Sequence, residues 1–313
     1  MNIGLDMMGG DFSPLEAVKG VRLYLQEVHA PVTVWLVGDE SKINPLLEEF
    51  TIPATSVRIV HASQTIDMNE HPTKALKEKQ QSSIAIGFHL LATGKMDAFI
   101  SAGNTGAMLV GALYSLKAIE GVQRPTISTV IPKDNGKTGI LLDAGLNSDC
   151  KPENLNQFAV LGSLYAKHIL GIDQPRVGLL NIGEEEGKGN ILAQASYPLL
   201  KENRHIHFIG NVEGRDILVD KADVIVCEGF TGNVILKLAE SLYDISSRHK
   251  IGSEYFDRFD FEYYGGTPVL GVTKPVIIGH GISRERAFDN MLRLAQKMIE
   301  TDLLAKMKES FVA

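Results

Sequence analysis

Short apolar runs alternate along most of the chain with longer segments in which apolar residues recur at helical spacing. The short runs are rich in β-branched residues, which is typical of buried strands. Strands are predicted at residues 2–6, 32–37, 57–60, 98–101, 127–131, 139–142, 177–181, 207–210, 224–227 and 276–279. Such alternation predicts a largely parallel sheet covered by helices on both faces.

Helices are predicted between these strands, from Ser13 and at residues 73–92, 104–120, 153–170, 190–202, 232–248 and 284–308. The first should begin with a capping box, in which Ser13 caps the helix, Pro14 occupies its first turn and the Glu16 carboxylate returns to the cap. No internal repeat or low-complexity linker interrupts the pattern. The chain is therefore expected to form a single α/β domain over residues 1–313.

Three glycine-containing turns each follow a predicted strand and precede a predicted helix. They are SAGNTGA at 101–107, NIGEEEGKG at 181–189 and EGFTGN at 228–233. Glycines allow a sharp turn, and the free amides at a helix amino end favour an anion. One such turn is common in α/β proteins, but three in one chain favour phosphate chemistry.

Polar side chains occupy the predicted strand ends, where ligands bind in open parallel sheets. If the strands are parallel neighbours, these residues share one crevice. They are Asp6, Ser101, Asn104, Asn181, Lys188, Glu228, Asn233 and His280.

Three side chains suggest specific chemistry. Lys188, among glycines, could reach a phosphate as a point charge, or could be an ordinary solvated lysine. His280, also between glycines, could donate a proton near neutral pH, or could be a hydrogen-bonded loop residue. Arg124 could contact either an anion or a carboxylate.

Composition narrows the possible functions. The chain is 44% hydrophobic and 22% charged, and no apolar run approaches the roughly 20 residues of a membrane span. Its net charge of −7 argues against general nucleic-acid binding. The start lacks the features of a signal peptide, so a cytoplasmic location is expected. Cys150 and Cys227 lack metal-ligand spacing and are expected to be reduced thiols.

Several common catalytic motifs are missing from the sequence. No Gly-x-Gly-x-x-Gly follows a strand, the 183–189 loop lacks Walker spacing, and no Gly-x-Ser-x-Gly elbow is present. A covalent acyl-enzyme is therefore not indicated, and the nucleophile could come from solution. No metal and no cofactor are expected.

The motifs together resemble the PlsX-type phosphate acyltransferases almost from end to end. The resemblance rests on DMMGGD (6–11), SAGNTGA (101–107), LDAGLN (142–147), NIGEEEGKG (181–189), GNVEGRD (210–216), GFTGN (229–233), YGG (264–266) and HGIS (280–283). Met7, Leu146 and Glu228 depart from the family pattern, which affects the expected pocket shape more than the reaction class.

The resemblance implies an enzyme that makes acyl phosphate and free acyl carrier protein (ACP) from acyl-ACP and inorganic phosphate. It implies a Rossmann-like α/β/α sandwich related to phosphotransacetylases and isopropylmalate dehydrogenases, and a homodimer. It also implies peripheral membrane association, and a membrane glycerol-3-phosphate acyltransferase that uses the product in bacterial phospholipid synthesis.

The roles that follow are hypotheses. Backbone amides around Gly103, Asn104, Thr105, Gly232 and Asn233, with Ser101, Lys188 and Arg124, would hold phosphate against the thioester. The catalytic set is expected to be Lys188, His280, Asn181, Asn233 and Asp6. An asparagine among Asn104, Asn181 and Asn233 would donate to the oxyanion, and His280 would assist the departing thiolate. Asp6 could cap a helix, order a turn or orient a catalytic cation.

Two surfaces could interact with partners. An acidic ACP calls for a basic patch, with candidates at Arg284, Arg286, Arg293 and Lys297, or at Arg248 and Lys250. A helical and aromatic excursion at about 234–263 carries an apolar stripe at Val234, Leu238, Leu242 and Ile245, suited to packing, a dimer interface or membrane contact. Two other functions remain open: a dehydrogenase on the related fold, and a non-catalytic regulator that binds a phosphorylated ligand.

Overall fold

The computed structural model describes residues 1–312, which group into two compact units. Unit 1 comprises Met1–Lys117 and Phe261–Glu300, and unit 2 comprises Ala118–Asp260 and the residues from Thr301 on. Each unit is an α/β structure, so the predicted fold class is confirmed. The prediction of a single catalytic domain stays a prediction.

The sheet of unit 1 is parallel except for one hairpin. Its strand order is β3 (Val57–His61), β2 (Thr33–Gly38), β1 (Asn2–Asp6), β4 (Ala98–Ser101), β11 (Val276–Gly279) and β10 (Gly266–Leu270). All neighbouring pairs are parallel except β10 and β11. Strands β1, β4 and β11 therefore end at the same edge of this sheet.

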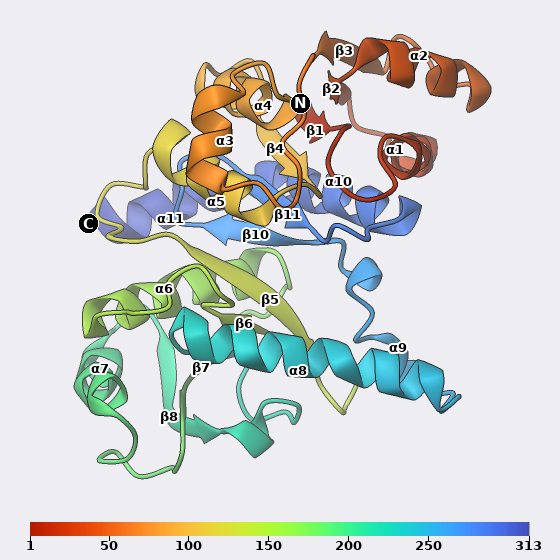
Figure 1. The fold of residues 1–313 in the computed structure, drawn as a ribbon. Coiled ribbons are helices and arrows are strands. Elements are labelled where there is room, and N and C mark those ends of the chain that lie inside the picture. The colour runs from red at the N-terminus through yellow and green to blue at the C-terminus, as the bar shows by residue number, and fades with distance from the viewer. Residues whose placement is uncertain (313) are drawn as a thin grey trace. The chain divides into compact units, whose positions relative to one another are not determined.

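Helices cover the sheet of unit 1 on both sides (Figure 1). Helices α1 (Leu15–Glu27) and α10 (Glu285–Glu300) pack together, whereas α4 (Ser83–Ala92) packs with α5 (Thr105–Ser115). The shorter helices are α2 (Glu40–Glu49), α3 (Pro72–Glu78) and the 3₁₀ turn η2 (Phe261–Tyr263). Between α4, α5 and the sheet, the rings of Phe88 and Phe99 pack edge to face with centroids 5.3 Å apart.

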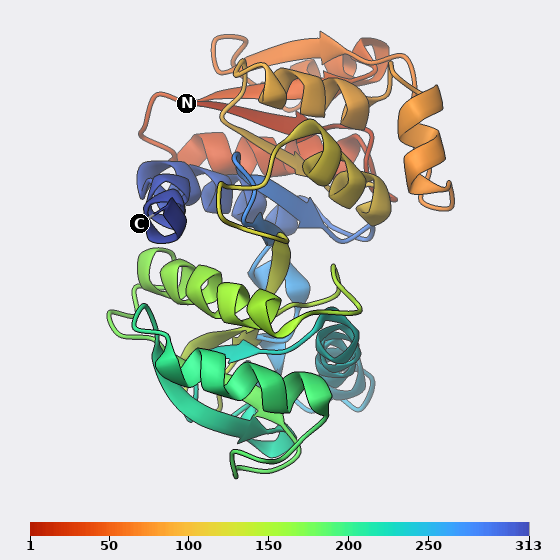
Figure 2. The ribbon, with the colours of Figure 1, turned by 90° about the vertical axis from the view of Figure 1, so that its left-hand side faces the viewer.

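The sheet of unit 2 has the order β5 (Thr126–Pro132), β6 (Thr138–Leu142), β9 (Val224–Val226), β7 (Arg176–Asn181) and β8 (His207–Glu213). Only the β5–β6 pair is antiparallel. Helices α6 (Pro152–His168) and α7 (Ile191–Glu202) lie side by side (Figure 2). Helix α8 (Gly229–Arg248) follows β9, and α11 (Leu303–Val312) packs on α6. The 3₁₀ turn η1 (Gly214–Asp216) follows β8, and α9 (Glu254–Asp257) follows α8.

All ten predicted strands are confirmed, but β10 and α2 were not predicted. The expected helices 73–92 and 284–308 are each two helices. The predicted capping box is wrong: the Ser13 hydroxyl donates to the carbonyl oxygen of Gly10 over 2.9 Å. The Glu16 carboxylate instead accepts from Lys19 over 2.7 Å and from the amide of Glu285 over 3.0 Å. The Glu16 carboxylate, which would have closed the capping box, thus bonds to the beginning of α10 instead.

The predicted excursion at 234–263 contains the rest of α8, then α9 and η2. Helix α8 exposes Phe230, Val234, Leu238 and Ile245, which include three positions of the predicted stripe. Within residues 1–312, no helix is long and apolar enough to cross a membrane.

Candidate functional site

In unit 1, hydrogen bonds join the loop after β1 to the loop after β11, and the loop after β4 to the loop after β3. The amide of Asp11 donates to the carbonyl oxygen of Gly281 over 2.7 Å. The side-chain amide of Asn104 donates to three carbonyl oxygens between residues 67 and 70, over 2.9 to 3.2 Å. These loops meet at the carboxyl ends of parallel strands, where a ligand site is expected.

Asp6, fully buried at the end of β1, organises this edge of the sheet. Its Oδ2 accepts from the Ser101 hydroxyl over 2.6 Å, and its Oδ1 accepts from the Met8 amide over 2.9 Å. The Ser101 hydroxyl in turn accepts from the Gly103 amide over 2.9 Å. Burial raises the pKa of Asp6, although hydrogen bonds, the one from Ser101 foremost, oppose the rise. Three predicted site residues thus belong to one buried network.

Asn104 and Thr105 begin α5. Asn104 is buried, and its Oδ1 caps the helix by accepting from the Ala107 amide over 2.9 Å. With its amide group also bonded, Asn104 is fully engaged by the protein. Thr105 is exposed, and the amides of Thr105 and Gly106 have no acceptor within the helix. The donors that α5 can offer to an anion are therefore these two amides.

His280 follows β11 and is half-buried. Its ring stacks on Phe261 with centroids 4.4 Å apart. Its backbone carbonyl accepts from the Ser283 amide over 3.0 Å, which closes the turn that leads into α10. His280 therefore has a defined ring orientation beside the Asp11–Gly281 contact.

In unit 2, Asn181 ends β7 and shapes the loop that follows it. Its Nδ2 donates to the carbonyl oxygen of Lys188 over 3.1 Å, and its Oδ1 accepts from the amide of Ile182 over 2.8 Å. Gly189 has φ +94°, and a Cβ there would lie 2.3 Å from the Asn181 Oδ1. The glycine is therefore required both by its backbone conformation and by the closeness of Asn181.

Lys188 lies exposed in this loop. Two of the neighbouring carboxylates are paired with other lysines: Glu184 with Lys221 over 2.6 Å, and Glu186 with Lys201 over 2.5 Å. No ion pair of Lys188 is seen among the described residues, whereas two acidic neighbours have theirs. The loop thus presents an ammonium group to solvent, which suits an anionic ligand.

The amino end of α8 packs against the loop after β6. Glu228 caps the helix, accepting from the Thr231 amide over 2.7 Å. A Cβ at Gly232 would lie only 1.8 Å from the carbonyl oxygen of Asp143, so only glycine fits there. Asn233 is exposed, and its Nδ2 makes a long bond of 3.3 Å to the carbonyl oxygen of Ala144.

Asp143 was not predicted as a site residue, although it lies in the LDAGLN motif. It is fully buried and accepts from the amides of Gly145, Leu146 and Asn147 over 2.7 to 3.1 Å. Burial raises the pKa of Asp143, and these hydrogen bonds oppose the rise. The strand-end position could have identified it, since Asp6 is placed in the same way on β1.

Arg124 lies on the surface of unit 2, where its Nη1 donates to the carbonyl oxygen of Asp149 over 2.8 Å. Among residues 1–312, no carboxylate is seen paired with Arg124, and Arg124 does not line the cavity of unit 2 that is described next.

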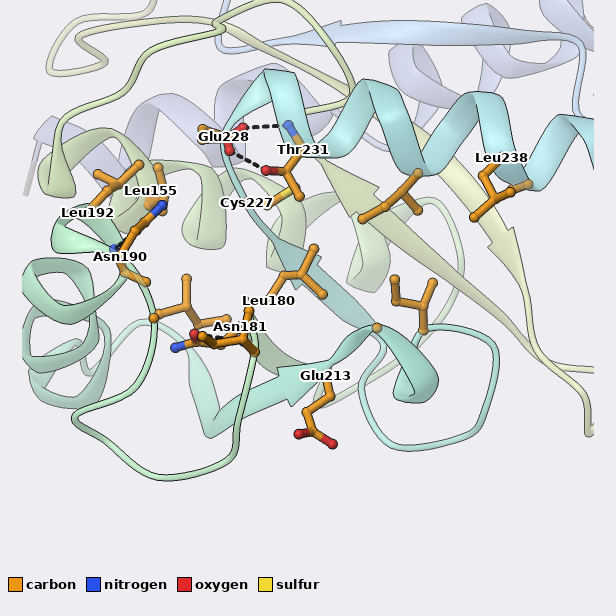
Figure 3. Close-up of a pocket in the computed structure, with 18 of the residues that line it drawn as sticks. Leu155, Leu180, Asn181, Asn190, Leu192, Glu213, Cys227, Glu228, Thr231 and Leu238 are labelled. Atoms are coloured by element: carbon orange, nitrogen blue, oxygen red, sulfur yellow. Dashed lines mark hydrogen bonds between the residues drawn. The ribbon is translucent and has the colours of Figure 1, made fainter.

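A cavity of about 860 Å³ opens between α8 and the carboxyl end of β7 (Figure 3). Apolar side chains form most of its wall, including Leu155, Leu180, Leu192 and Leu238. The lining also includes polar residues from the Asn181 loop and from the α8 cap: Asn181, Asn190, Glu228 and Thr231. An apolar cavity with a few grouped polar residues is the usual form of a small-molecule site.

The predicted site residues fall into two sets. Unit 1 holds Asp6, Ser101, Gly103, Asn104, Thr105 and His280, while unit 2 holds Arg124, Asn181, Lys188, Gly232 and Asn233. Within each unit, the members near the strand ends come together as described. The single crevice shared by both sets stays a prediction.

A family model and similar proteins both indicate which family this chain belongs to. Residues 1–248 match the model of the family described as "Fatty acid synthesis protein". A phosphate acyltransferase of Dictyoglomus turgidum is 44% identical, over 99% of this chain and 97% of that protein. One from Aquifex aeolicus is also 44% identical, over 98% and 96%.

Solved structures share the fold. A phosphotransacetylase from Streptococcus pyogenes superposes with a TM-score of 0.69 at 18% identity, covering 96% of this chain and 94% of its own. A branched-chain phosphotransacylase from Enterococcus faecalis V583 gives a TM-score of 0.62 at 16% identity, covering 96% and 99%. At these identities the likeness extends to the fold alone.

Proposed function

Since this chain belongs to the phosphate acyltransferase family of enzymes, we propose that it transfers a long-chain acyl group from acyl-ACP to inorganic phosphate. The products are an acyl phosphate and the free ACP thiol. We further propose that the acyl phosphate feeds glycerol-3-phosphate acylation in bacterial phospholipid synthesis.

One observation carries this proposal. The cavity of unit 2 is bordered both by the loop that presents Lys188 and by the capped amino end of α8. The Lys188 ammonium suits phosphate, whereas the apolar wall suits an acyl chain. The same cavity thus combines the two kinds of contact that the two substrates require.

The reaction makes modest demands on the enzyme. A phosphate oxygen bonds to the thioester carbon, the carbon–sulfur bond breaks, and its electron pair leaves on sulfur, which takes up a proton. Phosphate is already an anion at neutral pH, and a thiol with a pKa of about 8.5 is a fair leaving group. Holding the reactants in position is therefore the main task.

The contacts within each unit refine the expected roles. Asp6, Ser101, Gly103 and Asn104 act as positioning residues, because their polar groups already bond to the protein. The amides of Thr105 and Gly106, at the amino end of α5, then contact phosphate.

In unit 2, Lys188 holds phosphate and Asn181 supports the Lys188 loop through the loop's own carbonyl. Asn233, exposed and only weakly bonded, donates to the oxyanion, and Gly232 allows the helix end to approach. His280 gives a proton to the departing thiolate, and Arg124 adds positive charge for the acidic substrates.

The partners follow from the same proposal. Arg284 and Arg286 are the better candidates for docking ACP, since both are exposed, whereas Arg293 is paired with Asp289 and Glu27. The apolar residues exposed on α8 suit either a homodimer contact or a peripheral membrane contact from the cytoplasm. The downstream partner is a membrane glycerol-3-phosphate acyltransferase.

The test is to incubate the purified protein with long-chain acyl-ACP and phosphate, and to follow free thiol and acyl phosphate together. Equal, phosphate-dependent release of both products supports the proposal. Thiol without acyl phosphate would mean hydrolysis, and no product from folded protein would favour a regulator that binds a phosphorylated ligand. Nicotinamide binding would instead support a dehydrogenase.

A further inference from the structure

The cavity of unit 2 is more polar at one end, beside the amino end of α8, than further along this helix. Most of its polar lining comes from the strand-end loop, with Asn181 and Asn190, and from the amino end of α8, with Glu228 and Thr231. Further along α8, the lining residues Ile235, Leu238, Ala239 and Leu242 are all apolar. Figure 3 shows Glu228 and Thr231 at the beginning of the helix, with Leu238 farther along it.

The opposite wall is largely apolar as well. Glu213 also belongs to it, but its carboxylate is paired with Arg215 and points away from α8 in Figure 3. Leu180 and Leu218 line the cavity and pack against a buried cluster that includes Leu141 and Ile225. This wall therefore belongs to the core of unit 2. A ligand lying between it and α8 would meet mainly apolar atoms along its length, and would meet the grouped polar residues at one end.

We propose that this cavity holds the acyl chain and measures its length. The acyl carbonyl lies at the Asn181–Thr231 end, and the terminal methyl group points toward Leu242. This inference rests on the proposed function, because it assigns a place to the acyl part of that substrate. A long alkyl chain is the occupant that needs an elongated apolar space with a single polar end.

The helix provides the scale of this measurement. From Thr231 to Leu242 the helix axis advances by about 16 Å. An extended alkyl chain of roughly 1.5 Å bonds advances about 1.3 Å per carbon. About twelve carbons therefore reach from the polar end to Leu242. Within that length, each buried methylene should increase kcat/KM about fourfold, and carbons beyond it should add little.

A bulky residue halfway along α8 should shorten the cavity. Ala239 lines it three residues before Leu242, so Ala239→Trp removes about 4.5 Å of length, or three to four carbons. Lys237→Trp is the matched control, since Lys237 lies on the same helix, is exposed and is absent from the cavity wall. Leu242→Ala makes the opposite change by opening the far end.

The experiment compares kcat/KM for acyl-ACP of 8 to 16 carbons, from phosphate-dependent thiol release. Ala239→Trp should reduce the preference for 12 over 8 carbons roughly 100-fold, while Lys237→Trp keeps the wild-type profile. Leu242→Ala should extend the increase in kcat/KM to longer acyl chains. This variant tests the inference independently if Ala239→Trp does not fold. An unchanged chain-length profile in a folded Ala239→Trp or Leu242→Ala variant would overturn the inference.

Two further readouts separate the possible failures. Dodecanoate binding, measured by calorimetry, should be lost in Ala239→Trp and kept in Lys237→Trp. If the wild type makes no acyl phosphate yet shows this binding pattern, the proposed function fails and the cavity assignment stands. If light scattering shows that Ala239→Trp only separates a dimer into monomers, with its chain-length profile unchanged, the cavity is a contact between copies and the inference is wrong.

Discussion

Replacing Gly232 by alanine tests whether the amino end of α8 must lie against the loop after β6. The added Cβ would be 1.8 Å from the carbonyl oxygen of Asp143 and 3.2 Å from the sulfur of Cys227. Because Cβ atoms essentially never approach other heavy atoms closer than 3.0 Å, the two backbones must separate by about 1.2 Å. No flexible side chain can absorb this movement, since the closest atom is backbone.

The expected effects on rate and on stability differ in size. A misplacement of about 1 Å in a catalytic site can cost on the order of a hundredfold in rate. Overpacking costs about 1–3 kcal/mol of stability, but alanine in place of glycine in a helix returns up to about 1 kcal/mol. We therefore expect kcat/KM to fall about a hundredfold, while the free energy of unfolding falls by about 2 kcal/mol or less.

The assay is phosphate-dependent thiol release, with urea unfolding measured on the same preparations. Gly252→Ala is the control, because Gly252 follows α8 and an added Cβ there meets nothing within 4 Å. This variant should match the wild type in both measurements. A Gly232→Ala variant with the wild-type rate would refute the argument that the close approach of α8 to Asp143 serves catalysis.

Three other changes have defined outcomes. Ser101→Ala removes a buried hydroxyl bonded to Asp6 and Gly103, and urea unfolding should show a loss of about 1–3 kcal/mol; the exposed change Thr105→Ala should stay near wild type. Lys188→Ala should raise the KM for phosphate about tenfold and leave the urea midpoint unchanged, because the side chain is exposed; an unchanged KM would remove Lys188 from the phosphate site. Burial lowers the pKa of Lys133 to about 8, so the native protein binds fewer protons than the unfolded chain from there up to pH 10.5. The free energy of unfolding should therefore rise with pH across this window, by up to about 3 kcal/mol, and Lys133→Met should lose that rise.

The strands of this fold are predictable from the sequence because most are short, buried and β-branched. Strand β10 is not, because it contains Pro268, which lacks an amide hydrogen, and begins at the second of two consecutive glycines. It forms a strand because it pairs with β11, and this contact cannot be predicted from the propensities of its own residues. Helix α2 is missed for a similar reason: it contains Pro45 and buries only Ile43, so it has almost no apolar periodicity.

The candidate site is predictable in position but less so in the role of each residue. The glycine turns at α5, α7 and α8 all begin helices after strands, as expected. What the sequence could not show is which polar groups the protein itself uses. From the sequence, Asn104 is a candidate oxyanion donor. In the structure, its side chain instead bonds three carbonyl oxygens and caps α5. Such bonds join residues nearly forty positions apart, and no local pattern encodes them.

Both units contain a buried aspartate at the end of a strand, Asp6 in unit 1 and Asp143 in unit 2. Each is a fully buried carboxylate at a strand end, and each accepts from backbone amides of the loop that follows it. Burial disfavours the charged form of both groups, so their loops must supply hydrogen bonds that hold it.

These carboxylates occupy the amides of their own loops, whereas the amides at the amino ends of α5 and α8 belong to other segments. A loop without such an internal acceptor would turn its own amides toward any nearby anion and would lose a fixed shape. Asp6→Asn and Asp143→Asn should therefore weaken phosphate binding in the acyl transfer assay, although neither carboxylate could itself attract phosphate. Tighter phosphate binding in these variants would show instead that negative charge near the site is a cost to the enzyme, and would contradict the positioning role.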